Sequence, residues 1–136
     1  GRIKMLMAKV TGLHGDKMRQ TPDGKKSLTD YAVIERAAMA AAWIALKPHT
    51  GRTHQLRLHC AEIGHPIIGD GKYGGELAYL TGSISRKLHL HAESLRFPHP
   101  NGGDMHVRAP LPPHMLESFE TLGFSLEDYE DPFEDQ

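Results

Sequence analysis

The run from residue 50 to residue 75, TGRTHQLRLHCAEIGHPIIGDGKYGG, carries most of the structural and chemical signal in this chain of 136 residues. It opens with a glycine turn and passes directly into a helix signal. The first turn of a helix exposes unpaired N–H groups and a partial positive charge, which attract anions. Arg52 and Arg57 add two guanidinium groups, whose planar forks suit phosphate or carboxylate. The run therefore predicts a helix that begins at an anion-binding corner.

The helix itself is predicted over residues 53–64. Thr53 can cap its N-terminus, and Gly64 is a good C-terminal stop. The side chains expected to face the core at helical spacing are Leu56, Cys60 and Ile63. Arg57 lies beside that stripe and is expected to reach a partly buried carboxylate, whereas His54 is expected at the rim.

Alternation of apolar and polar residues predicts strands at residues 1–10, 27–35, 88–97 and 105–109. Residues 36–47 are ambiguous, because their alanines favour a helix while the proline that follows favours a strand over residues 41–47. The segments expected without long regular structure are a mobile basic loop at 11–26, a short turn-to-strand piece at 65–69, a glycine-rich loop at 70–75 and a turn at 98–104. A second helix is predicted over residues 111–122. This order predicts an α+β fold with a mixed or antiparallel sheet and few helices, since a doubly wound parallel sheet needs regular strand–helix alternation.

Charge is distributed unevenly along the chain. All 16 Lys and Arg residues and nine of the 17 Asp and Glu residues precede Glu117, an excess of seven positive charges. Residues 1–116 are therefore expected to form a body able to hold phosphates. Residues 117–136 are expected to be a separate, solvated acidic tail. Ordinary surface charge explains the same excess equally well.

The chain has no apolar run near the roughly 20 residues needed to span a bilayer, so no membrane association is predicted. Its single cysteine, Cys60, excludes an internal disulfide and fits a reducing, cytoplasmic compartment. The first residue is Gly1 rather than Met, so the sequence is expected to be a piece of a longer protein. No metal is predicted, because the histidines lack the helical i, i+4 spacing of a typical zinc pair.

The quoted run resembles the signature segment of the RluA-type pseudouridine synthases. The resemblance continues in SLTDYAVIE at residues 27–35, in KLHLHAESLRFPHP at 87–100 and in the Ala-Pro-Leu-Pro stretch at 109–112. It implies the C-terminal half of a pseudouridine synthase fold, and an activity that isomerises uridine in RNA without a metal or organic cofactor. Family members act most often on large-subunit ribosomal RNA, and some act on transfer RNA.

The resemblance also implies site residues. Arg57 matches the arginine that pairs with the catalytic aspartate of such enzymes, and a nearby guanidinium would keep that carboxylate ionised. The aspartate belongs to a His-Arg-Leu-Asp segment, which is absent here, so the chain alone is expected to be inactive. The residues expected to contact RNA are Arg52, His54 and Gln55 beside the site, Lys87 and Leu88 near the uracil pocket, and Lys17, Arg19, Lys25 and Lys26 in the basic loop.

Two other functions remain open from the sequence. The chain could be a stand-alone RNA-binding module that has lost catalysis, or, with ten histidines, a structural or metal-binding protein. A truncated domain also leaves an open sheet edge and uncovered apolar surface. Marginal stability or self-association is therefore expected.

Overall fold

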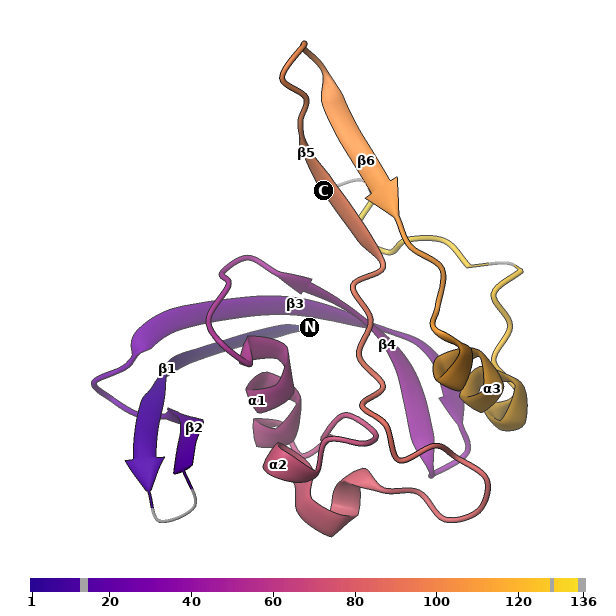
Figure 1. Cartoon of the computed structure of the whole chain (residues 1–136), viewed down its shortest axis with the longest axis horizontal. Coiled ribbons are helices and arrows are strands. Elements are labelled where there is room, and N and C mark those ends of the chain that lie inside the picture. The colour runs from indigo at the N-terminus through magenta and orange to yellow at the C-terminus, as the bar shows by residue number, and fades with distance from the viewer. Residues whose placement is uncertain (13–14, 128, 135–136) are drawn as a thin grey trace.

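The computed structural model describes residues 1–12, 15–127 and 129–134. Its main sheet has four strands in the order β2-β1-β3-β4, and every neighbouring pair is antiparallel. These strands are β1 (Arg2–Gly12), β2 (Gly15–Gln20), β3 (Lys25–Ala37) and β4 (Ala41–Pro48). A separate two-stranded hairpin joins β5 (Ser94–Pro98) to β6 (Asp104–Arg108). The α+β class with antiparallel sheets is confirmed (Figure 1).

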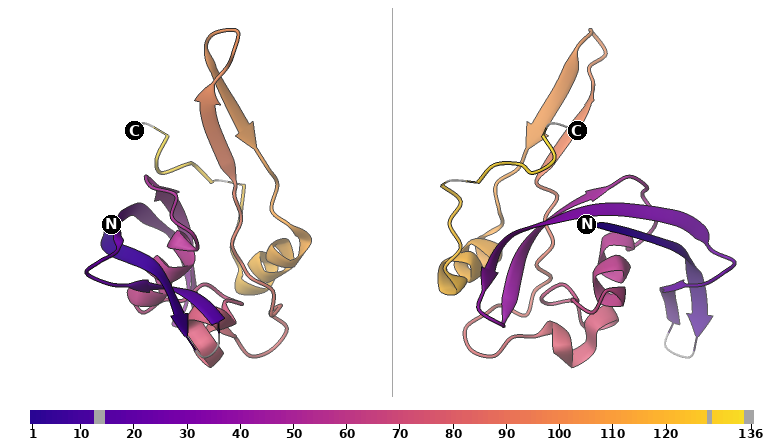
Figure 2. Two further views of the ribbon diagram at one scale, coloured as in Figure 1. Left: turned by 60° about the vertical axis from the view of Figure 1, so that its left-hand side comes forward. Right: turned by 180° about the vertical axis from the view of Figure 1, so that it is seen from behind.

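Helix α1 (Gln55–Glu62) lies against one face of this sheet, here called the inner face (Figures 1 and 2). Alternation along β1 and β3 sends Ile3, Met7, Ser27 and Thr29 to the inner face, where all four are buried. Met7 packs with Met18 and Leu58 in the core. In β1 the inner-face residues Ile3 and Met7 are the apolar ones of the predicted alternation, whereas in β3 the polar Ser27 and Thr29 are buried there and Leu28 lies on the opposite face.

The predicted loop at residues 11–26 is wrong for most of its described part. Residues 15–20 form β2, which pairs with β1, and a turn remains only after it, where Gly24 N donates to Thr21 O. Residues 13 and 14 lie outside the described residues. Met18 is the only buried residue of β2, so the strand shows almost no apolar alternation in the sequence.

Helix α1 is confirmed, but its start and its buried face differ from the prediction. His54, not Thr53, precedes the helix, with φ at +53° and no side-chain cap. The buried residues are Gln55, Leu58, His59 and Cys60, whereas Ile63 is 38% exposed. The helix is rotated because two polar residues occupy its buried face and hydrogen-bond to β3: Gln55 to Thr29, and His59 to Ser27.

The glycine-rich loop predicted at residues 70–75 is instead a short helix α2 (Gly71–Gly74), followed by a 3₁₀ turn η1 (Gly75–Ala78). Asp70 caps α2 by accepting from Tyr73 N at 3.4 Å. The piece before it is a turn rather than a strand. Gly69 is required there, because a Cβ would lie 2.0 Å from the carbonyl oxygen of Lys87.

The strand predicted over residues 88–97 is ladder-paired only from Ser94, in β5. Its hairpin with β6 stands away from the rest of the chain, and every residue of both strands is exposed (Figures 1 and 2). The strand predicted at residues 105–109 and the turn before it are confirmed.

The final helix α3 (Pro113–Leu122) contains the boundary that the sequence placed at Glu117. The described residues that follow Glu117 do not form a freely solvated tail. Trp43 of β4 packs against Phe119 with ring centroids 4.9 Å apart, and against Tyr129 at 5.1 Å. Among the described residues, no helix is long and apolar enough to cross a membrane.

Candidate functional site

The side chain of Gln55 organises the start of α1. Its Oε1 accepts from Thr50 Oγ1 at 2.7 Å and from Arg52 N at 3.1 Å, and its Nε2 donates to Leu28 O and Thr29 Oγ1. Gln55 is only 4% exposed, and its amide groups are fully used. The prediction that Gln55 contacts RNA is therefore wrong, and its role is to fix the glycine turn against β3.

Arg57 forms a two-point ion pair with Asp70. Its Nη2 donates to Asp70 Oδ1 at 2.7 Å, and its Nε donates to Oδ2 at 3.2 Å. The Asp70 side chain is completely buried, whereas the Arg57 side chain is 21% exposed. The hydrogen bond to Asp70 raises the pKa of Arg57, so the guanidinium stays charged. Arg57 does reach a buried carboxylate, and that carboxylate, Asp70, lies within the chain.

Tyr73 and His54 complete the cluster around Arg57. The Tyr73 ring lies 5.2 Å from the guanidinium carbon, and its hydroxyl is 2.8 Å from His54 Nδ1. Arg57 Nη1 lies 3.4 Å from His54 Nε2, and a guanidinium can only donate. Burial, and then the charge of Arg57, lower the pKa of His54, which favours the neutral ring with its proton on Nδ1. His54 is held at positive φ, a conformation that folded proteins often keep at functional sites.

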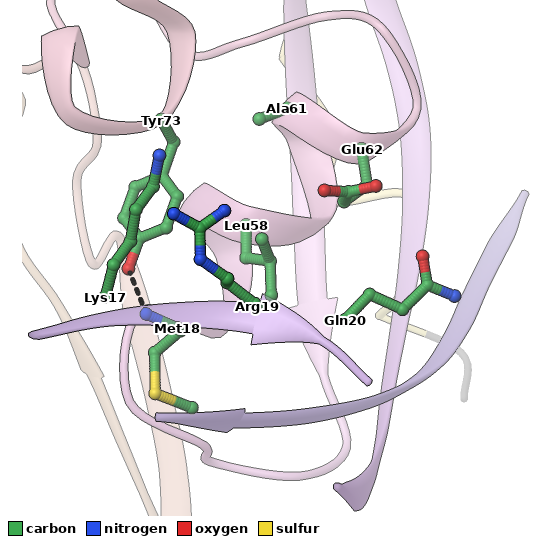
Figure 3. A pocket seen from close by; sticks show the side chains of 8 residues that line it. All are labelled: Lys17, Met18, Arg19, Gln20, Leu58, Ala61, Glu62 and Tyr73. Atoms are coloured by element: carbon green, nitrogen blue, oxygen red, sulfur yellow. Dashed lines mark hydrogen bonds between the residues drawn. The ribbon is translucent and has the colours of Figure 1, made fainter. Parts of the chain in front are cut away.

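Two residues of β2, which the sequence placed in a basic loop, contact this cluster: Lys17 and Met18. The ammonium of Lys17 lies 5.1 Å from the centre of the Tyr73 ring, and the Tyr73 hydroxyl accepts from Met18 N at 3.2 Å. A pocket of about 250 Å³ opens between β2 and α1 beside Tyr73 (Figure 3). Its lining residues are Lys17, Met18, Arg19, Gln20, Leu58, Ala61, Glu62 and Tyr73. Lys17 and Arg19 therefore line a hollow next to Arg57.

The other predicted contacts lie elsewhere. Arg52 Nε donates to the carbonyl of Lys26 at 3.0 Å, which places Arg52 with Lys25 and Lys26 at the start of β3. Lys87 is exposed and lies in the segment that passes over Gly69, and Leu88 follows it, half-buried. No hydrogen bond or ion pair among the described residues joins Lys87 or Leu88 to Arg57.

Sequence reasoning missed Asp70 and Tyr73 as members of the site. The available signal was the spacing Asp-x-x-Tyr after Gly69, which is a helix cap followed by one turn. Within the described residues, no group of three His, Cys, Asp or Glu side chains is arranged to hold a metal ion. The cluster can bind an anion or an acidic group, because it exposes cations beside a neutral imidazole.

Comparisons with known proteins find similarity to RNA pseudouridine synthases. The family model for RNA pseudouridylate synthases matches residues 1–62. The dual-specificity RNA pseudouridine synthase RluA of Salmonella typhi is 47% identical over 81 residues, which cover 60% of this chain and 36% of that protein. The ribosomal large subunit pseudouridine synthase D of Vibrio vulnificus is 37% identical over 127 residues, covering 84% and 39%.

A solved structure of human RNA pseudouridylate synthase domain containing 1 superposes with a TM-score of 0.58 at 27% identity, and covers 91% of this chain and 60% of that one. The chain spans less than two fifths of the length of either of the two bacterial relatives. Fold, signature run and relatives agree in one similarity, which is to the RluA-type pseudouridine synthases.

Proposed function

We propose that this chain is part of an enzyme that converts uridine to pseudouridine in RNA, with large-subunit ribosomal RNA as the substrate class. The observation that carries the proposal is the cluster of Arg57, Asp70, Tyr73 and His54, which is built entirely from the signature run. In this reaction the bond from C1′ to N1 of the base breaks, and a bond from C1′ to C5 forms. The proton on C5 is released to solvent and N1 takes up one proton, so the atoms of the nucleotide are conserved. A cytoplasmic location is part of the same proposal.

Asp70 is not the nucleophile in this proposal. Both of its oxygens accept hydrogen bonds from Arg57, and its side chain is completely buried. A carboxylate that attacks a ribose carbon must be accessible to the flipped nucleotide. The nucleophile is therefore an aspartate outside these residues, in a His-Arg-Leu-Asp segment.

Arg57 has a revised role in the proposal. Asp70 occupies the Nε hydrogen and one Nη2 hydrogen, and His54 accepts one Nη1 hydrogen, which leaves one hydrogen on Nη1 and one on Nη2 as a free edge for a second carboxylate. Asp70 thus orients the guanidinium, and the free edge holds the incoming nucleophile in its ionised form. Lys17 and Arg19, in the neighbouring pocket, are proposed to grip RNA phosphates near the mouth of the site.

Tritium release tests the proposed function. RNA carrying tritium at uridine C5 is incubated with the 136-residue chain, and with a chain extended upstream through a His-Arg-Leu-Asp segment. The extended chain is expected to release tritium and the short chain is not, because only the former contains the nucleophile. Release by the short chain contradicts the assignment of the nucleophile. Absence of release by a folded extended chain favours the alternative of an RNA-binding module without catalysis.

Self-association of the 136-residue chain is also proposed, through the β5–β6 hairpin. Leu95 opposes Val107 and Phe97 opposes Met105, so these four apolar side chains share one face, and they are 37–64% exposed. An isolated hairpin is marginally stable in water and gains from covering such a face.

Sedimentation is expected to show a concentration-dependent dimer or larger species. Leu95→Glu together with Val107→Glu should return the chain to a monomer, because these changes place charge on the apolar face. Arg96→Glu, on the opposite face of the hairpin, is the matched control and should leave association unchanged. A wild-type chain that sediments as a tightly folded monomer at all concentrations would contradict the proposed self-association.

A further inference from the structure

The face of the four-stranded sheet opposite α1, here called the outer face, carries unpaired positive charge. Residues directly opposite in an antiparallel pair share a face, and so do residues two apart along one strand. Arg2 opposes Asp30, Lys4 opposes Leu28, and Leu6 opposes Lys26. These residues alternate with the buried inner-face residues of β1 and β3, so their side chains lie on the outer face.

The only acid in this paired set is already satisfied. Asp30 accepts from Arg2 Nε at 2.7 Å and lies 2.8 Å from His49 Nε2. Among the described residues, no carboxylate lies within ion-pairing distance of Lys4 or Lys26. Both lysines are exposed, so their charges face solvent.

Arg52 adds a third cation at the border of this face. Its Nε donates to the carbonyl of Lys26, which fixes the side chain beside β3. The Nη groups make no hydrogen bond to the described residues and remain available. Lys4 and Lys26 are diagonal neighbours on adjacent strands, about 7–8 Å apart at their Cα atoms. Three cations thus form a short basic strip.

Lysines commonly protect the edge strands of sheets from aggregation, but this explanation does not fit the strip. β1 and β3 are the two central strands in the order β2-β1-β3-β4. Surface faces normally mix both signs of charge, whereas in the pairs from Arg2–Asp30 to Leu6–Lys26 only cations remain unpaired. Figures 1 and 2 draw no helix over β1 and β3 on the outer side. A polyanion is the ligand that such a strip fits.

We propose that Lys4, Lys26 and Arg52 bind the phosphate backbone of RNA on the outer face, as a contact separate from the pocket beside Tyr73. This inference rests on the proposed function, because it takes RNA as the polyanion. Ser27, next to Lys26, points to the inner face, where its hydroxyl meets His59 of α1. The strip and the Tyr73 cluster therefore lie on opposite faces of one sheet. RNA that touches both passes over the sheet edge and presents several nucleotides to the protein.

Salt-dependent binding tests the strip on the 136-residue chain. The probe is a labelled single-stranded oligouridine, and its affinity is measured by fluorescence anisotropy at several salt concentrations. Each phosphate contact contributes about 0.7 to the slope of log affinity against log salt for single strands. The double change Lys4→Gln, Lys26→Gln should lower that slope by about 1.4, which corresponds to roughly 25-fold weaker binding near 0.1 M salt.

The control variant removes two exposed arginines elsewhere, Arg36→Gln with Arg96→Gln, and should keep the wild-type slope. An equal slope change in the control would mean that net charge, not the strip, is responsible, and would overturn the inference. So would an unchanged slope in the lysine variant, or a wild-type chain that fails to bind oligouridine. None of these outcomes touches tritium release by the extended chain, so failure of the strip is distinguishable from failure of the proposed function.

Discussion

Arg57→Ala, in the chain extended through His-Arg-Leu-Asp, is expected to reduce tritium release by about a thousandfold, the upper range for loss of one preorganised charged donor. The reason is that the free edge of Arg57 is the group proposed to keep the nucleophilic carboxylate ionised. RNA affinity should stay near the wild-type value, because the phosphate grips are assigned to other residues. The measurements are initial rates of tritium release and filter binding of the same RNA.

A control is needed because Arg57 also neutralises the buried Asp70. Arg57→Lys keeps a positive charge near Asp70 but lacks the planar fork that can bind two carboxylates at once. It should fold better than Arg57→Ala and still lose most of the turnover. Near-normal turnover in Arg57→Ala would remove Arg57 from the proposed mechanism. Rates are compared only at temperatures where circular dichroism shows both variants folded.

The signature run illustrates what the sequence could predict. The glycine turn, the helix after it and the reach of Arg57 toward a buried carboxylate all follow from local spacing and chemistry. The identity of that carboxylate did not follow. Asp70 lies 13 residues along the chain, after a turn that allows it to fold back, and nothing local marks it as a partner. Pairing across a turn depends on tertiary structure, and sequence periodicity does not predict it.

The buried face of α1 was wrong for a related reason. Amphipathic spacing assumes that buried positions are apolar. Here Gln55 and His59 are buried because β3 offers them Thr29 and Ser27 as partners. Burial lowers the pKa of His59, which favours the neutral ring that can occupy the core. A polar residue is predicted to be exposed when its hydrogen-bond partner lies on a distant strand, because the sequence does not indicate that partner. The prediction therefore buried the wrong face of the helix.

Strand β2 was missed because an edge strand needs only one side chain in the core. Met18 supplies that contact, while Lys17 and Arg19 serve the pocket beside Tyr73. The fold therefore separates basic residues that the sequence placed together in one mobile RNA-binding loop. Lys17 and Arg19 lie beside the Arg57 cluster, and Lys26 lies with Arg52 at the start of β3. Charge counting found the cations, but only side-chain contacts show which of them lie beside the Arg57 cluster.

The ion pair itself makes the second large prediction, on stability. Arg57→Ala in the 136-residue chain should lower the free energy of unfolding by about 3–5 kcal/mol, because it leaves the fully buried Asp70 carboxylate without its partner. Asp70→Ala should cost less, since the guanidinium it releases is partly exposed and can be hydrated. Urea unfolding followed by circular dichroism measures both values.

The double variant Arg57→Ala, Asp70→Ala separates the pair from its surroundings. Its loss of stability should be clearly smaller than the two single losses added together, because no charge is left buried alone. Additive losses would show that the two side chains do not interact energetically, despite their 2.7 Å contact. In that case Asp70 would not orient Arg57, and the revised role of Arg57 would lose its structural basis. Strong coupling would mean that the buried aspartate fixes the guanidinium, so that its free edge is preorganised for a second carboxylate.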